Sequence, residues 1–158
     1  MRSKVGAGII GGLIGGLVFG MMMQMMTAPT PDGKEMPMMQ MVAMVVRSQS
    51  VVVGWAYHLF NSAVIGAIFG WLFGSRSDSY GSGLGWGAVY GIIWWILGAQ
   101  ILMPILLGMP PFASIMMPPM RMVAVGSLVG HLIFGLILGG SFVWLSRSTG
   151  VTVAPSAQ

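Results

Sequence analysis

Four apolar stretches, each long enough to cross a lipid bilayer, constrain the fold of this chain most strongly. They cover residues 5–26, 51–73, 84–107 and 123–145, and a helix needs roughly 20 apolar residues to span the hydrocarbon core. Only 6% of the 158 residues are charged, whereas a soluble domain carries about 25%. We therefore expect an all-α integral membrane protein of a prokaryotic inner or cell membrane. It would have four transmembrane helices in one domain over 1–158, with a polar tail at 149–158.

The first apolar stretch follows Arg2 and Lys4, as a signal peptide would. It is longer than the apolar region of a signal peptide, which has about 7–15 residues, so we interpret it as a transmembrane helix. Cytoplasmic loops carry more Lys and Arg than outer loops. With both termini in the cytoplasm, the inner basic residues are Arg2, Lys4, Arg76 and Arg147, and the outer ones are Lys34, Arg47 and Arg121. This small excess favours cytoplasmic termini.

The polar residues argue against several functional classes. The net charge is +4, but the basic residues are scattered singly, whereas a nucleic-acid-binding surface clusters them. The acidic residues are Asp32, Glu35 and Asp78, all between the apolar stretches, and cysteine is absent. No acid–base dyad, nucleophile–histidine pair or phosphate-binding loop is recognisable. We expect a protein that is not an enzyme and has no nucleic-acid partner.

The chain also aligns with itself after an ungapped shift of 73 residues. His58 then meets His131, the only other histidine, and the shift also pairs Gly8 with Gly81 and Gly12 with Gly85. This pattern predicts two helix–loop–helix repeats, at about 5–75 and 78–148. Because each repeat holds two spans, the repeats would be parallel and related by a pseudo-two-fold axis along the membrane normal.

Small residues four positions apart follow every predicted helix. Such ridges let helix backbones approach closely inside a membrane. The first three are Gly8-Gly12-Gly16-Gly20, Ser62-Gly66-Gly70-Gly74 and Gly83-Gly87-Gly91, and the fourth helix carries Gly126, Gly130, Gly135 and Gly139. We expect tight packing within one chain, and surfaces left over for other membrane subunits or a homo-oligomer.

His58 and His131 are the candidate site residues, because an ionisable side chain inside the membrane is costly and is a functional hypothesis by default. Three interpretations stay open. Each imidazole could hydrogen-bond a backbone carbonyl and fix the bundle. The pair could bind a cofactor, with haem b as the example, or a metal ion. The pair could also relay protons or line an ion path.

The connections at 28–50 and 108–122 are rich in methionine and proline rather than polar. They predict either short helices in the membrane interface or re-entrant segments packed against the bundle. Thioether sulfur suits Cu(I), but methionine is also an adaptable apolar filler. The methionines show no repeated spacing, so the identity of any metal stays unknown.

Three segments carry a family resemblance: GWAYHLFNSAVIGAIFG, GAVYGIIWWILGAQILMP and GSLVGHLIFGLILGG. Together they resemble a family of small four-helix bacterial and archaeal integral membrane proteins, catalogued only as a domain of unknown function. The resemblance implies the fold and the membrane location, and it implies no activity for any residue.

These observations predict a non-catalytic integral membrane subunit with an accessory role, packed in the lipid bilayer against other membrane chains. Two alternatives stay open. One is a haem- or metal-binding electron-transfer protein that uses His58 and His131. The other is a small channel or transporter.

Overall fold

The computed structural model describes residues 4–29 and 34–147. Its four long helices are apolar enough to cross a membrane and cover Lys4–Gln24, Val51–Leu72, Tyr80–Leu106 and Pro118–Arg147. They confirm the four predicted spans. The predicted polar tail at 149–158 lies outside the described residues, as do Arg2 and Asp32.

The third span begins four residues earlier than predicted. A reciprocal serine cap starts α4 (Tyr80–Trp94). The Ser82 amide donates to Ser79 Oγ (3.2 Å), and the Ser79 amide donates to Ser82 Oγ (3.1 Å). This capping box satisfies amide groups that have no partner inside the helix.

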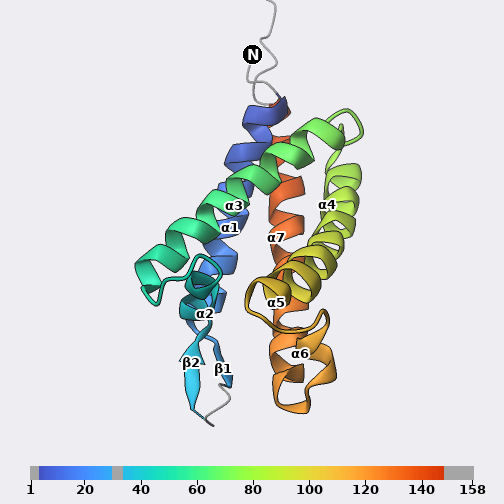
Figure 1. Ribbon diagram of the computed structural model, residues 1–158. Coiled ribbons are helices and arrows are strands. Elements are labelled where there is room, and N and C mark those ends of the chain that lie inside the picture. The colour runs from blue at the N-terminus through green and yellow to red at the C-terminus, as the bar shows by residue number, and fades with distance from the viewer. Residues whose placement is uncertain (1–3, 30–33, 148–158) are drawn as a thin grey trace, which may run out of the picture.

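Helix α1 (Lys4–Gln24) lies between α3 (Val51–Leu72) and α7 (Arg121–Arg147), and α4 packs on the other side of α7 (Figure 1). Two glycine ridges on α1 permit this. Gly8 and Gly12 face the backbone of α3 around Gly66, and Gly11 and Gly15 face the backbone of α7. A single added Cβ on either ridge would approach main-chain atoms of the neighbouring helix closely. The glycines therefore act in packing within the chain.

Glycines also join α4 to α7. A Cβ on Gly87 would overlap the Gly135 carbonyl oxygen, and one on Gly139 would overlap that of Gly83. Two glycine pairs from the ungapped alignment are not equivalent in this respect. Gly85 has no atom within 4 Å of a built Cβ and Gly81 only a serine hydroxyl at 3.9 Å, whereas their partners Gly8 and Gly12 touch α3 directly. Gly81 and Gly85 therefore do not pack as Gly8 and Gly12 do.

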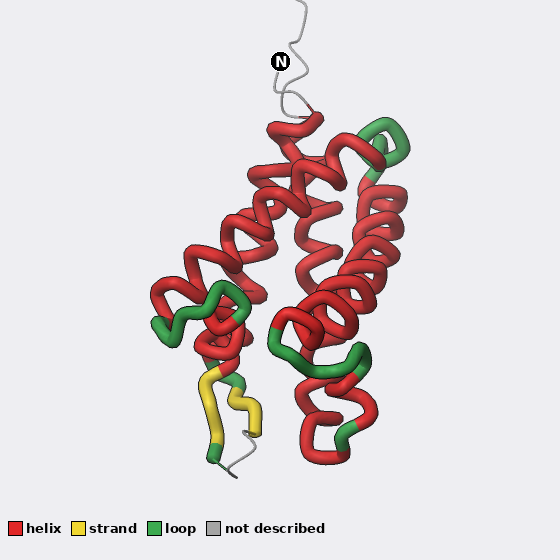
Figure 2. Tube along the Cα trace, viewed as in Figure 1, coloured by secondary structure: helices red, strands yellow, loops and turns green. Residues whose placement is uncertain are grey.

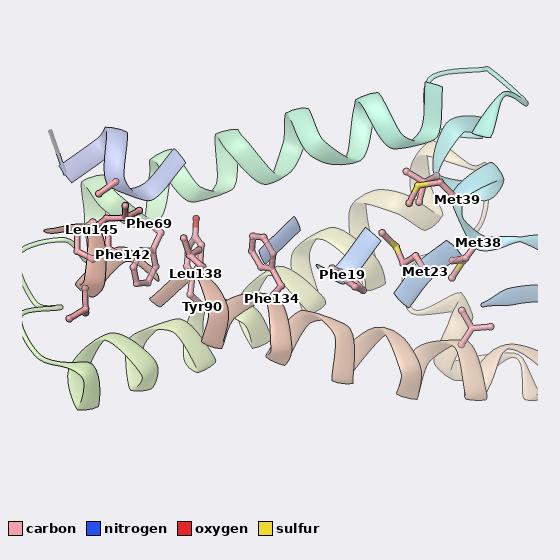
Figure 3. Packing of buried hydrophobic residues seen from close by; sticks show 14 of the residues in the cluster. Phe19, Met23, Met38, Met39, Phe69, Tyr90, Phe134, Leu138, Phe142 and Leu145 are labelled. Carbon is pink, nitrogen blue, oxygen red and sulfur yellow. The ribbon is translucent and has the colours of Figure 1, made fainter. Parts of the chain in front are cut away.

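The buried core forms a line of side chains along the bundle rather than a central cluster (Figure 3). Phe69, Phe142 and Leu145 lie at one end, where Phe69 and Phe142 meet edge to face with centroids 5.6 Å apart. Phe134 and Phe19 lie further along, before the methionines at the other end. The apolar side chains fill the space that the glycine contacts leave open.

Helices α3 and α4 meet at the short turn over 73–79 and diverge toward their other ends (Figure 1). Near the turn they are joined by side chains, because Tyr90 Oη donates to the Ile65 carbonyl oxygen (2.8 Å) and the Tyr90 ring contacts Phe69. Their backbones do not pack closely, unlike those of α1 with α3 or α4 with α7. The divergence leaves room between the α1–α3 pair and the α4–α7 pair.

The sequence predicts a uniform α-helix for the third span, and the structure differs. The span continues from α4 as a π-helix, η1 (Trp95–Leu102), and ends in α5 (Met103–Leu106). Pro104 has no N–H to donate to the Gln100 carbonyl one turn earlier, and the Phe112 amide donates to that carbonyl instead (2.6 Å). The buried Gln100 side chain also accepts from Ser114 Oγ (2.6 Å). The proline thus creates a docking point for the following connection.

The two connections at the end of the bundle opposite the 73–79 turn are built differently (Figure 2). The first contains an antiparallel hairpin of β1 (Thr27–Pro29) and β2 (Glu35–Pro37), then α2 (Met38–Met44). The second contains α6 (Ala113–Met116) and the 3-10 turn η2 (Pro118–Met120). The hairpin was not expected from the sequence. Because Met39 and Ala43 are fully buried, and Met39 contacts Gly54 of α3, α2 packs against the bundle.

Candidate functional site

The divergence of α3 from η1 opens a cavity of about 360 Å³. Both sequence-predicted site residues line it, although they come from different helices. Four further lining residues matter most for its chemistry and shape: Phe19, Asn61, Trp94 and Phe134. The fold therefore brings His58 and His131 to one site.

His58 ties α3 to α1. Its Nε2 lies 2.8 Å from the Gly16 carbonyl oxygen, which it can reach because Gly16 has no side chain. A carbonyl oxygen can only accept, so Nε2 carries the proton. A charged imidazolium is costly at membrane depth, and in the neutral ring Nδ1 therefore keeps the free lone pair. This contact agrees with the interpretation in which His58 hydrogen-bonds a backbone carbonyl and fixes the bundle.

His131 uses its opposite nitrogen and binds its own helix. Its Nδ1 lies 2.7 Å from the Ser127 carbonyl oxygen and must donate to it. Nε2 then holds the lone pair in the neutral ring. It makes no hydrogen bond to another described residue, and the His131 residue lines the cavity. The hydrogen bond of His131 does not join two helices, so a structural role explains it less well than it explains His58.

Phe19 lies against both histidines. Its ring centroid is 5.7 Å from that of His58 and 4.8 Å from that of His131, in edge-on arrangements. The ring is 5% exposed, and a Cβ on Gly130 would overlap it. Phe19 therefore fixes the relative position of the two imidazoles from α1.

Asn61 is a cavity residue that the sequence analysis did not single out. It stands one turn after His58 and makes no hydrogen bond to another described residue. Its amide offers both donors and an acceptor. It is the only asparagine in the chain, and this isolated amide inside an apolar span was the available signal.

Apart from Tyr57, Ser62 and Ser127, the remaining wall is mostly apolar, and it reaches the outer surface of the bundle. Four methionines line the end near α2, including Met23 and Met103. Val64, Leu102 and Leu106 also line the cavity, and they are 42–57% exposed. These three belong to spans that could cross a membrane, so the cavity opens sideways, toward the region that lipid would occupy.

A bis-histidine haem does not fit this arrangement. The Nε2 atom of His58 is bound to Gly16, and the Phe19 ring contacts both imidazoles. Ligation through both Nε2 atoms would require the hydrogen bond to break and the phenyl ring to move. For metal ions, no group of three or more His, Cys, Asp or Glu side chains lies together within 4–29 and 34–147.

A scan of protein-family models, a search of curated proteins and a search of solved structures found no match to this chain. The resemblance to the four-helix family of unknown function therefore stays a prediction.

Proposed function

We propose that this protein is an integral membrane binding protein that takes a small, largely apolar molecule from the bilayer into the cavity between α3 and η1. One observation carries the proposal. His58, His131 and Asn61 line a single cavity whose wall is otherwise mostly apolar and whose mouth lies between two potential membrane spans. The other lining residues with polar side-chain atoms are Tyr57, Ser62, Trp94 and Ser127. Ligand sites have this composition, with few polar groups that orient the molecule in an apolar pocket.

The cavity is large enough for such a ligand. Pockets for small molecules measure about 300–1,000 Å³, and a cavity of roughly 150 Å³ holds one benzene ring. The volume of about 360 Å³ therefore accepts a ring-sized head group and a short piece of chain. The side opening lets a longer chain extend into lipid.

Filling the cavity should strongly reduce binding. Gly98 lines the cavity, and an added Cβ there would meet only the Trp94 ring, at 3.7 Å. We expect Gly98→Leu to fold and to lower the amount of bound lipid-soluble molecule at least fivefold. The measurement is native mass spectrometry of protein reconstituted in nanodiscs of bacterial polar lipid extract.

Gly85→Leu is the matched control, because Gly85 lies in the same span with no atom within 4 Å of a built Cβ. It should retain the wild-type complement of bound molecules. Equal occupancy in wild type and Gly98→Leu, or an empty wild-type protein, would refute the binding function.

The packing also supports the proposed repeat and orientation. Gly12 faces Ser62 and Gly66 as Gly87 faces Gly135 and Gly139. The proposed repeats would then correspond with an offset of 75 residues in their first helices and 73 in their second. Lys4 and Arg147 lie at the end of the bundle that holds the turn over 73–79. Lys4 Nζ donates to Ser75 Oγ, and Arg147 donates to the Asp78 carbonyl oxygen. We propose that this basic end faces the cytoplasm.

An accessory role in a larger complex remains a separate prediction, as does a small channel or transporter. The glycine ridges that suggested free packing surfaces are used largely within the chain. If the accessory role holds, the protein should purify in mild detergent with other membrane subunits or as an oligomer. Light scattering that finds only the monomer mass would count against it.

A further inference from the structure

We propose that the cavity selects a neutral molecule whose polar head is a hydroxyl group, carried on an apolar ring or chain. The inference rests on the proposed binding function and names the chemistry of its ligand. It follows from which atoms of His58, His131 and Asn61 remain available for hydrogen bonding.

The two histidines present acceptors rather than donors. The proton-bearing nitrogen of each imidazole already donates a hydrogen bond to a backbone carbonyl oxygen, that of Gly16 for His58 and that of Ser127 for His131. What remains is the lone pair of His58 Nδ1 and that of His131 Nε2. A ligand that only accepts, such as a ketone or quinone, leaves these lone pairs unmatched. A hydroxyl can donate to one of them.

Asn61 can hold the oxygen atom of the head group. Its amide can donate to the hydroxyl oxygen while the hydroxyl proton is directed at an imidazole. A hydroxyl both donates and accepts, so it satisfies both kinds of partner with a single oxygen atom. Leaving a buried polar group unsatisfied is costly, and this cost should separate hydroxyl ligands from carbonyl ligands.

The same wall disfavours charged head groups. The residues that line the cavity include no Asp, Glu, Lys or Arg, so they provide no counter-ion for an amine or a phosphate. Burial of an unpaired charge at membrane depth is costly. The head group should therefore be neutral.

Two sources of a hydroxyl head fit this chemistry: a phenol or hydroquinone with an apolar tail, and an aliphatic alcohol. Phe19, Tyr57, Trp94 and Phe134 supply aromatic walls that can meet a planar ring edge-on or offset. We expect the aromatic source to bind more tightly. The tail would leave through the mouth beside Leu102 and Leu106.

The test uses three probes with the same decyl tail: a hydroquinone, the corresponding benzoquinone and the primary alcohol. Binding to the protein in nanodiscs is titrated without oxygen, so that the hydroquinone stays reduced. We expect the hydroquinone to bind at least tenfold more tightly than the benzoquinone, which corresponds to about 1.4 kcal/mol. The ratio of alcohol to hydroquinone affinity then distinguishes the two sources.

Two variants test the atoms involved. His131→Phe keeps a ring but removes the acceptor, and Asn61→Leu removes the amide at similar size. His131→Phe should bring the ratio of hydroquinone to benzoquinone affinity closer to one, because it removes one of the two acceptors. Asn61→Leu should weaken both probes, because a quinone carbonyl can use the amide donor as well as a hydroxyl can. Phe60→Leu, on the lipid-facing side of α3 (Phe60 is 65% exposed), should keep the full preference.

Equal or tighter binding of the benzoquinone would overturn the hydroxyl inference, and so would a preference that is undiminished in His131→Phe. If no probe binds but the Gly98→Leu experiment still shows cavity-dependent occupancy, the inference fails and the binding function stands. If no probe binds and that occupancy is also absent, both fail.

Discussion

Gly66→Ala is expected to destabilise the protein by about 3 kcal/mol or more, although it adds only one methyl group. The added carbon would overlap the Gly8 carbonyl oxygen and lie 2.9 Å from the Gly12 Cα atom. Both neighbours are main-chain atoms of α1, so neither can move away as a flexible side chain could. The helices must separate, and overpacking of this kind costs typically about 1–3 kcal/mol, occasionally more. Unfolding in mild detergent, monitored by circular dichroism, measures the change in the free energy of unfolding.

Gly85→Ala provides a control that should change stability in the opposite direction. It adds the same methyl group to a transmembrane helix, where no atom lies within 4 Å of the built Cβ. Alanine has a helix propensity better than that of glycine by up to about 1 kcal/mol, so this variant should be equal to or more stable than wild type. If both variants have the same stability, the close α1–α3 approach cannot be what holds the bundle together.

The sequence could predict the long helices because their determinants are local. A run of about 20 apolar residues satisfies its own backbone hydrogen bonds only as a helix when it lies in lipid. The ridge from Gly8 to Gly20 likewise predicts close packing of α1, because spacing of four places small residues on one helix face. Neither pattern says which helix is the partner. The structure assigns that ridge to α3, and a second pair, Gly11 and Gly15, to α7.

The cavity could not be predicted, because it depends on what fails to pack. It exists where α3 diverges from η1, and that angle follows from contacts distant in the sequence. The π-helical geometry of η1 is also non-local in part, because the carbonyl of Gln100 is satisfied by Phe112 in the following connection. Asn61 becomes notable only because it lines the same cavity as both histidines.

The hydrogen bonding of the two histidines could also not be predicted from the sequence. Sequence reasoning identifies His58 and His131 as the ionisable residues within the spans, but it cannot tell which nitrogen of each ring is engaged. Gly16 and Ser127 decide that through backbone carbonyls. The Gly16 partner of His58 lies on another helix, so the lone pair that His58 keeps free depends on tertiary structure. The Ser127 partner of His131 lies one turn earlier on the same helix.

Phe19→Ala should have the second large effect, on both stability and the site. The Phe19 ring is nearly fully buried and contacts both imidazoles. Its removal should cost about 3 kcal/mol, the lower end of the range for Phe-to-Ala changes in packed cores. It should also enlarge the cavity at its histidine end. Thermal unfolding in mild detergent measures the first effect, and titration with hydroquinones of increasing ring size measures the second.

Phe60→Ala separates packing from simple loss of a large apolar side chain. It removes the same ring from α3, where Phe60 is largely exposed on the outside of the bundle, so it should cost less than about 1 kcal/mol and leave ring-size selection unchanged. A Phe19→Ala protein that matches Phe60→Ala in stability would show that the ring does not support the histidines. If Phe19→Ala is less stable but binds larger rings no better, Phe19 supports the fold without limiting the size of the ligand.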